Sequence, residues 1–475
     1  MKKWMIRALS ALLIAAFLPL SVLADEYDLN EGSVTVSTTK GADGSTRQDV
    51  SHKGTTKPDS NPTITSKGQQ TGNTVIINAG AGTTANVTIK DANISASSGK
   101  AAIKTGGEGN VNLNVEGTNT VSSGSNYAGV EKANAGNLTI GSESGSGELT
   151  ANGGWHGAGI GGGHYRDAND ITITGGEVTA NGGDGAAGIG GGYYSYGKDI
   201  TISGGKVVAN GSGSAAGIGG GHYGNGSNIT ISGGEVTATG GDYGAGIGGG
   251  YYGNGSNITI SGGEVTATGG DCGAGIGGGY GRGGSNIAIS KNSQVEAVGG
   301  AVGGAGGSSD GCGAAIGNGG NNNRVNGSEI EPDTSGLYTT GKVERKRGDG
   351  TVLDTITGTV DPSAKPASSE EEPDKREPLY RVLNLDGSSL KHQAQKADGV
   401  LALTAKADGA ILTGTLRALG YLQNQGIEKI TFTDGTHSAE LVLAELIAKG
   451  QPEDVYVLTL GAENTLTLNG EAIDF

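Results

Sequence analysis

An internal repeat with a period of 29 residues limits the folds open to this chain more than any other feature. One isoleucine stands in a Gly-Ile-Gly-Gly-Gly block at Ile160, Ile189, Ile218, Ile247 and Ile276. A second isoleucine, in blocks such as Ile-Thr-Ile-Ser-Gly-Gly, follows at Ile171, Ile200, Ile229, Ile258 and Ile287. Each unit contains three short runs of alternating apolar and polar residues separated by glycines, which is typical of three strands and three turns.

Within one unit, the apolar residues of all three runs fall on one face when the runs are taken as strands. In the third unit these residues are Ile229, Ile231, Val236, Ala238, Ala245 and Ile247. A single unit cannot bury such a face, whereas stacked copies bury it continuously and pair their backbones between coils. Burial of each isoleucine contributes roughly 1.5–3 kcal/mol. The repeat therefore predicts an all-β fold, a right-handed parallel β-helix (solenoid), because parallel crossovers are almost always right-handed.

Two other interpretations of a glycine-rich repeat fit less well. The 475 residues include 96 glycines and only 34% are hydrophobic, a composition that would also suit a flexible linker. A linker does not explain why isoleucine returns at a fixed offset in every unit. Calcium-binding nonapeptide rolls have a different period, and the spacing of residues 242–247 does not match them.

Changes in composition along the chain predict five segments. These are a signal peptide over 1–24, an N-terminal cap and loop over 25–73, the β-helix over 74–325, a linker with a hairpin over 326–378, and a small α+β domain over 379–475. The signal peptide is indicated by a basic start, a short apolar stretch and small residues before position 25. Within the second segment, Gly41–Pro62 is expected to be a loop. We therefore expect a secreted, extracellular protein, free or associated with the cell surface.

Charge and hydropathy argue against two classes of partner. The net charge is −16, and it becomes −19 when the three cations of residues 1–24 are removed. Nucleic-acid binding requires patches of Lys and Arg, so no nucleic acid is expected. No later segment has the roughly 18 consecutive apolar residues of a membrane span.

Aromatic residues follow the glycine block in almost every unit. They are His164, Tyr165, Tyr193, Tyr194, His222, Tyr223, Tyr251, Tyr252 and Tyr280. In a stack of coils these residues line up along one corner at spacings that suit ring contacts. The pattern predicts a linear platform for sugar rings or, alternatively, a structural stack that stiffens the corner. The scarcity of phenylalanine favours the platform, because a buried stack would accept Phe equally well.

Acidic residues also recur at equal offsets. Asp242 and Asp271 share one register, and Glu235 and Glu264 share another. Two like charges about 5 Å apart repel by only ~0.8 kcal/mol in water, so such ladders can persist as solvated surface. The alternative is a calcium ion that bridges the carboxylates with backbone carbonyls. These four residues are therefore the candidate metal ligands.

The two cysteines have the same register. Cys272 precedes Ile276 by four residues, and Cys312 precedes Ile316 by four. Neighbouring coils lie about 4.8 Å apart, which is inside the Cα window of roughly 4.4–6.8 Å for a disulfide. Closing a loop of about 40 residues would stabilise the fold by ~4 kcal/mol in the chain-entropy model. We predict a disulfide, with two free stacked thiols as the alternative.

No catalytic constellation emerges from the repeat. Polysaccharide lyases and hydrolases also use β-helices, but catalysis needs one differentiated pair of groups with unlike environments. The acidic residues here belong to repeated rows, and Arg166, Arg282 and Trp155-His156 do not form a recognisable acid–base pair. Outward threonine rows also suit an ice-binding surface, although threonine is a routine residue on strand surfaces.

The segment before the repeat resembles a known bacterial family. Asn73–Ile77, Ala85–Ile94, Asn114–Asn119 and Gly136–Gly141 carry this resemblance, which covers about residues 28–154. The family comprises secreted pectin-type carbohydrate-binding proteins of fibre-degrading anaerobes. The resemblance implies a right-handed parallel β-helix that binds an acidic plant polysaccharide such as polygalacturonate, with calcium as a bridging cation. The family's metal ligands have no residue-by-residue match in this chain.

The sequence as a whole favours a secreted, non-catalytic protein that binds an acidic polysaccharide of plant or microbial origin with calcium. The alternatives are a structural or adhesive cell-surface repeat protein and a polysaccharide lyase or hydrolase. In the C-terminal domain, a helix is expected over Thr413–Asn424, another over Ala444–Lys449, and strands around them. No chemistry is evident in that domain, and its partner is not indicated.

Overall fold

A computed structural model describes residues 25–301, 313–320, 326–360, 380–386, 388, 390–397, 399–424, 427–450 and 454–473. The chain divides into two compact units, one ending at Ala364 and the other beginning at Lys365. The signal peptide predicted over residues 1–24 lies outside the described residues. None of the described helices is long and apolar enough to cross a membrane.

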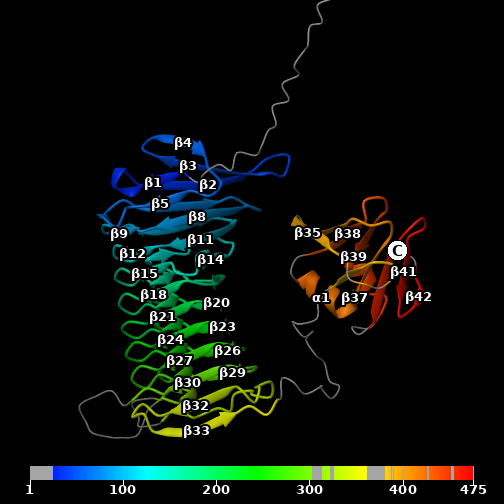
Figure 1. Ribbon diagram of the computed structural model, residues 1–475. Coiled ribbons are helices and arrows are strands. Elements are labelled where there is room, and N and C mark those ends of the chain that lie inside the picture. The colour runs from blue at the N-terminus through cyan, green and yellow to red at the C-terminus, as the bar shows by residue number, and fades with distance from the viewer. Residues whose placement is uncertain are drawn as a thin grey trace, which may run out of the picture. The chain divides into compact units, whose positions relative to one another are not determined.

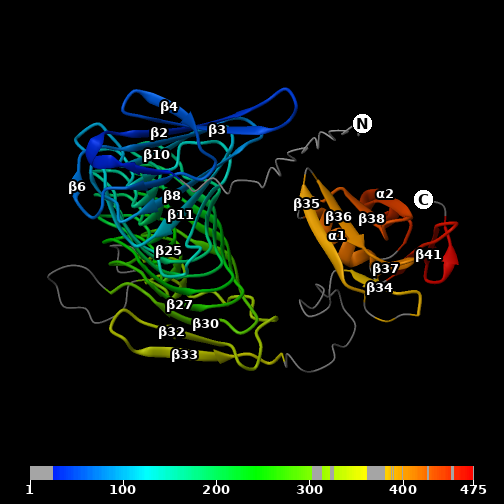
Figure 2. The same ribbon diagram turned by 45° about the horizontal axis from the view of Figure 1, so that its top comes forward.

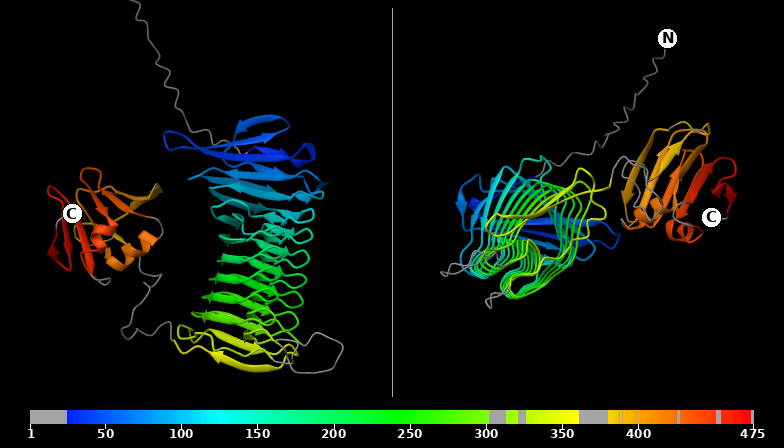
Figure 3. Two further views of the ribbon diagram at one scale, coloured as in Figure 1. Left: turned by 180° about the vertical axis from the view of Figure 1, so that it is seen from behind. Right: turned by 90° about the horizontal axis from the view of Figure 1, so that it is seen from below.

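The first unit is a parallel β-helix, as predicted, in which three sheets run along the whole stack (Figure 1). Seen along the stack, the coils superimpose on one another (Figure 3, right). The first sheet has the order β1 (Glu26–Asp28), β5 (Thr63–Thr65), β8 (Thr84–Lys90), β11 (Asn110–Glu116), β14 (Leu138–Gly141), β17 (Ile171–Ile173), β20 (Gly197–Ile202), β23 (Gly226–Ile231), β26 (Gly255–Ile260) and β29 (Gly284–Ile289).

The other two sheets complete each coil. The second contains β4 (Thr55–Pro58), β3 (Thr46–His52), β2 (Val34–Lys40), β7 (Val75–Ala79), β10 (Ile103–Gly107), β13 (Val130–Glu131), β16 (Ile160–Gly161), β19 (Ile189–Gly190), β22 (Ile218–Gly219), β25 (Ile247–Gly248), β28 (Ile276–Gly277) and β31 (Ile316–Gly317). The third contains β6 (Gln70–Thr71), β9 (Asn93–Ser95), β12 (Thr118–Ser122), β15 (Glu148–Asn152), β18 (Glu177–Asn181), β21 (Lys206–Asn210), β24 (Glu235–Thr239), β27 (Glu264–Thr268), β30 (Gln294–Val298), β32 (Lys342–Lys346) and β33 (Val352–Thr357).

The isoleucine rows form the core of the stack. Ile200 pairs with Ile229, and Ile229 pairs with Ile258, so equal offsets in the sequence are direct neighbours in space. The predicted inward residues are at most 1% exposed, namely Ile229, Ile231, Val236, Ala238, Ala245 and Ile247. The 29-residue register predicted from the sequence is therefore confirmed.

The glycine after the isoleucine of each Gly-Ile-Gly block is required by close packing between coils. Gly190 has φ +138°, and a Cβ atom at this position would lie 2.0 Å from the carbonyl oxygen of Gly219 in the next coil. Gly219 has φ +131° and the same relation to Gly248. No residue with a side chain fits here, which explains why the block recurs unchanged.

The N-terminal end differs from the expectation of a loop over Gly41–Pro62. This stretch contains β3 and β4, which continue the second sheet from β2 in antiparallel pairs (Figure 2). A short 3₁₀ helix, Leu29–Glu31, precedes β2. The alternation in β3 is hard to detect because only one of its two buried residues, Val50, is apolar, whereas the other is Gln48. The stack of coils also begins before residue 74, since β1 already pairs with β5 and β5 with β8.

The hairpin predicted around residues 348–350 is present. β32 and β33 pair in antiparallel fashion, and β32 also pairs in parallel with β30. The hairpin therefore extends the third sheet and does not stand apart in a linker. Arg345, which is 5% exposed, forms ion pairs with Glu331 and Asp354.

The described residues of the second unit form two small sheets, two helices and a core of their own. One sheet contains β34 (Arg381–Leu383), β37 (Ala410–Thr415), β40 (Val455–Leu460), β41 (Thr465–Leu468) and β42 (Glu471–Ala472). The other contains β35 (His392–Ala397), β36 (Val400–Ala405), β38 (Lys429–Thr433) and β39 (Ser438–Val442), and the helices are α1 (Leu416–Asn424) and α2 (Leu443–Ile447). Both predicted helices are present, but the first begins at Leu416 because residues before it belong to β37. Leu419, Phe432 and Tyr456 are fully buried in this core.

Candidate functional site

The aromatic residues that follow the glycine blocks separate into two rows. The first row, which we call the inner ladder, contains His164, Tyr193, His222, Tyr251 and Tyr280. The second row, the outer ladder, contains Tyr165, Tyr194, Tyr223 and Tyr252. The members of each pair are adjacent in the sequence, yet they have different surroundings.

The inner ladder is a continuous stack of rings from Tyr193 to Tyr280. The ring centroids of Tyr193 and His222 lie 5.0 Å apart with an interplanar angle of 2°. Those of His222 and Tyr251 lie 5.2 Å apart, and those of Tyr251 and Tyr280 lie 5.1 Å apart. His164 meets Tyr193 edge-on at 5.7 Å. Offset and edge-to-face ring pairs of this kind stabilise the folded state.

Inner-ladder residues also connect loops of neighbouring coils. The backbone N–H of His222 donates to the carbonyl of Gly185, and that of Tyr251 donates to the carbonyl of Ser214. A Cβ atom on Gly185 would lie 2.3 Å from the ring of Tyr193, so the ring rests directly on this loop. The inner ladder therefore fills the space between adjacent loops, which is the structural role that the sequence left open.

Titration properties agree with this covered position. Burial, together with the neighbouring Tyr194 hydroxyl, raises the pKa of Tyr193 to about 12. Burial and the neighbouring Tyr252 likewise raise the pKa of Tyr251 to about 12. Burial lowers the pKa of His222, so this ring favours its neutral form.

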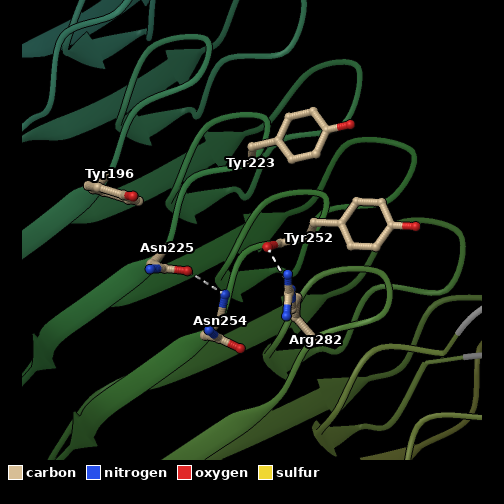
Figure 4. Close-up of a pocket in the computed structure, with 6 residues that line it drawn as sticks. All are labelled: Tyr196, Tyr223, Asn225, Tyr252, Asn254 and Arg282. Carbon is tan, nitrogen blue, oxygen red and sulfur yellow. Dashed lines mark hydrogen bonds between the residues drawn. The ribbon is translucent and has the colours of Figure 1, made fainter.

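The outer ladder is exposed. Tyr165 is 68% exposed, Tyr194 45%, Tyr223 44% and Tyr252 39%. Successive ring centroids lie 5.6, 5.3 and 5.8 Å apart, with interplanar angles of 18°, 4° and 7°. Figure 4 shows the rings of Tyr223 and Tyr252 side by side with their faces toward the viewer. The outer rings are therefore parallel to their neighbours, as the inner rings are, but their exposure leaves them open to a ligand.

The backbone of every outer-ladder tyrosine is strained. Their φ angles are +57°, +62°, +59° and +55° in chain order. A left-handed conformation costs a residue with a side chain roughly 1–2 kcal/mol relative to glycine. In the next coil the equivalent residue is Gly281, with φ +67°. Glycine fits this position, so the four successive coils keep exposed tyrosine rings at a cost in backbone strain.

A groove of about 530 Å³ runs beside the outer ladder (Figure 4). Its lining residues are Tyr196, Tyr223, Asn225, Tyr252, Asn254 and Arg282. Arg282 lies at the end of the ladder, where its Nε donates to the carbonyl oxygen of Tyr252 at 3.1 Å and its guanidinium carbon lies 5.8 Å from the Tyr252 ring centroid. These contacts hold Arg282 over the groove and leave its other N–H groups to bind an acceptor.

The asparagines of the groove have a defined orientation. The Oδ1 atom of Asn225 accepts from the backbone N–H of Asn254 at 2.8 Å, and the Oδ1 atom of Asn254 accepts from that of Gly283 at 3.2 Å. Because a backbone N–H can only donate, each amide turns its oxygen inward and has its NH₂ group available as a donor. Of the described residues that line the groove, none is acidic. The groove is therefore a surface of donors and aromatic rings with one cation.

Most residues that line the groove were not predicted from the sequence as site residues. Asp167, Tyr196, Asn225 and Asn254 follow the outer tyrosines by two residues and share one 29-residue register. Asp167 belongs to this row because its Oδ1 accepts from the backbone N–H of Tyr196 at 2.8 Å, as Asn225 does from Asn254. The only signal was the equal offset, since the row changes from an acidic residue to an aromatic one and then to two amides.

The predicted calcium ligands lie in two separate places in the structure. Glu235 and Glu264 are cross-strand neighbours on the exposed face of the third sheet, and Lys206 lies 4.0 Å from Glu235. Asp242 and Asp271 follow β24 and β27 at the same offset, and burial together with the charge of Asp242 raises the pKa of Asp271. Among the described residues, no group of three or more His, Cys, Asp and Glu side chains could hold a metal ion. Calcium binding stays a prediction.

The predicted disulfide has one described partner. Cys272 is 7% exposed, packs with Tyr280 and is not a free thiol. Cys312 lies outside the described residues, so the pairing stays a prediction. The register on which the predicted pairing depends is present, because Ile276 and Ile316 pair across neighbouring coils.

A comparison with family models matches a β-helix repeat to five stretches, residues 144–164, 171–193, 200–222, 229–251 and 258–280. The last four stretches begin 29 residues apart, and all five end at an inner-ladder residue. Comparisons with curated proteins and with solved structures give no match. The repeat match and the stacked sheets together support a parallel β-helix repeat protein, a fold that is consistent with a polysaccharide-related role.

Proposed function

We propose that this chain is a non-catalytic, secreted carbohydrate-binding protein that binds an acidic polysaccharide in the groove beside the outer ladder. The exposed ring faces of Tyr223 and Tyr252 carry the proposal. Aromatic faces bind the apolar C–H faces of sugar rings, while nearby amides donate to sugar oxygens. Four strained tyrosines at a position where the next coil has glycine support a role in binding.

The chemistry of the groove favours an anionic sugar. Asn225, Asn254 and Arg282 present donors, and Arg282 adds a positive charge within a chain whose net charge is −16. A guanidinium binds a carboxylate through two parallel hydrogen bonds, which fits the carboxylate of a uronic acid. A strongly acidic protein needs such a local cation to approach an acidic polymer.

Calcium is a separate part of the proposal. The predicted ligands Asp242, Asp271, Glu235 and Glu264 do not line the groove. Any calcium that they hold would bridge protein and polymer elsewhere on the surface. Because Arg282 supplies a cation in the groove itself, binding there does not depend on calcium.

The test uses polygalacturonate and a double variant, Tyr223→Gly with Tyr252→Gly. Glycine suits the backbone at both positions, so the variant is expected to fold and to lose at least tenfold in affinity in pull-down or calorimetric titration. The matched control is Thr237→Ala with Thr266→Ala, which changes an outward pair of neighbouring threonines on the third sheet and is expected to bind normally.

Two further measurements distinguish the alternatives. Equal binding by both double variants would contradict the groove and favour a structural or adhesive spacer. Release of reducing or unsaturated sugars from the polymer would contradict the non-catalytic role. Repeating the titration with a chelator shows whether calcium contributes, and we expect the part of binding that depends on Tyr223 and Tyr252 to survive chelation.

A further inference from the structure

We infer that the groove binds an extended polysaccharide chain that runs along the axis of the β-helix with one sugar residue per coil. This inference rests on the proposed function and adds the geometry of the ligand. It excludes glycans that coil tightly or that cross the ladder at a right angle. It also predicts that the length of the site is set by the number of coils.

The direction follows from which coils line the groove. Tyr196, Tyr223, Tyr252 and Arg282 come from four successive coils, as their spacing along the repeat shows. A groove that touches equivalent corners of four stacked coils must run parallel to the stacking axis. A chain laid across this direction would meet a single tyrosine, and the other rings would stay uncovered.

The spacing follows from the repeat. Neighbouring outer-ladder rings lie 5.3 to 5.8 Å apart, close to the coil spacing of about 4.8 Å that backbone pairing imposes. An extended 1→4-linked pyranose chain advances by a similar distance with each residue. Each sugar ring can therefore cover one tyrosine without stretching the chain or skipping a coil.

Two successive coils repeat both halves of a sugar site. The coil of Tyr223 adds the amide of Asn225, and the coil of Tyr252 adds the amide of Asn254, with equivalent backbone hydrogen bonds that orient the two amides. A polymer whose residues repeat at the same interval meets the same ring and the same donor in both coils. A compact ligand could use only one such pair.

One end of the groove carries a positive charge. Arg282 lies at the end beyond Tyr252. A carboxylate on the sugar chain is favoured there, which makes the Arg282 end the stronger subsite for a uronate residue.

The experiment changes the number of coils. One variant lacks residues 200–228, which removes one coil with Tyr223 and keeps the register of Ile171 and Ile229. A second variant duplicates residues 229–257 and so adds one coil with one outer tyrosine. Repeat proteins tolerate such changes because each repeat contacts mainly its neighbours. Oligogalacturonides of increasing length are titrated against each protein, with circular dichroism to check the fold.

Affinity should rise with chain length and then level off. The length at which it levels off should be one residue shorter for the deletion and one longer for the duplication. The matched control duplicates the same coil but carries glycine in place of the new tyrosine, and its levelling length should equal that of the wild-type protein. Levelling at one length in all four proteins would overturn the inference.

The outcomes separate this inference from the proposed function. If the wild-type protein binds no oligogalacturonide and no polygalacturonate, the proposed function itself fails. A second outcome is that binding is present and is lost in the Tyr223→Gly, Tyr252→Gly variant, but the oligomer length at which affinity levels off does not change with the number of coils. In that case only the geometry inferred here fails.

Discussion

The inner and outer ladders differ in role although their residues are neighbours in the chain. Tyr251 is half-buried among rings and loops, whereas Tyr252, the next residue, is 39% exposed and presents a ring face. The difference arises from the backbone, because a φ of +55° at Tyr252 turns its side chain away from the stack. Two adjacent aromatic residues can therefore have separate roles, one stiffening the corner of the solenoid and the other supplying its binding surface.

Removing one ring from each ladder tests whether the two ladders contribute differently to stability. Tyr251→Ala should lower the free energy of unfolding by about 2–4 kcal/mol, because it leaves a gap between stacked rings and adjacent loops. Tyr252→Ala should change it by less than about 0.5 kcal/mol, as expected for an exposed side chain. Urea unfolding followed by circular dichroism measures both variants. Equal losses of stability would show that the two ladders are a single structural unit.

The cation at the end of the groove provides the next test. Arg282→Gln should weaken binding of polygalacturonate by about 1 kcal/mol, roughly fivefold, because an exposed charge pair contributes this much at most. The loss should shrink as salt is added, since salt screens the pair in the wild-type protein. Titration at low and high salt measures this effect. Arg166→Gln, at the other end of the corner, is the control and should leave affinity unchanged.

Much of the fold could be predicted from the sequence because a solenoid turns equal offsets into contacts. The pairing of Ile229 with Ile258 and the burial of Val236 follow directly from the repeat. The extra strands around Gln48 could not be found in this way, since they lie outside the repeat and bury few apolar residues.

The site could be predicted only in part. The repeat placed both aromatic rows at one corner, but it could not separate Tyr193 from Tyr194, because a positive φ at a tyrosine has no signal in the sequence. Glycine or asparagine would have indicated it. The other lining residues of the groove could not be predicted, because Tyr196 and Asn225 share a register but differ in chemical type.

The strain of the outer ladder predicts a small gain of stability. Tyr223→Gly should raise the free energy of unfolding by up to about 1 kcal/mol, because glycine accepts a φ of +59° without a steric penalty. Tyr223→Ala removes the same ring but keeps the strained backbone, so it should be less stable than the glycine variant. Thermal and urea unfolding of the two variants compare them directly. If the glycine variant were less stable than the alanine variant, the positive φ at Tyr223 would not be a source of strain.

His222, one of the two histidines of the inner ladder, predicts the smallest effect, a dependence of stability on pH. Burial lowers the pKa of His222 below its usual 6.5 in the folded protein. The neutral ring then contributes its full stability above pH 6.5, and part of it is lost as the pH falls through 6.5, because the unfolded chain binds the proton more readily. His222→Tyr is the matched variant, since Tyr193 and Tyr251 hold the same position in neighbouring coils. Between pH 8 and pH 5 its urea midpoint should fall less than that of the wild-type protein, and equal falls would show that His222 is protonated as easily in the stack as in the unfolded chain.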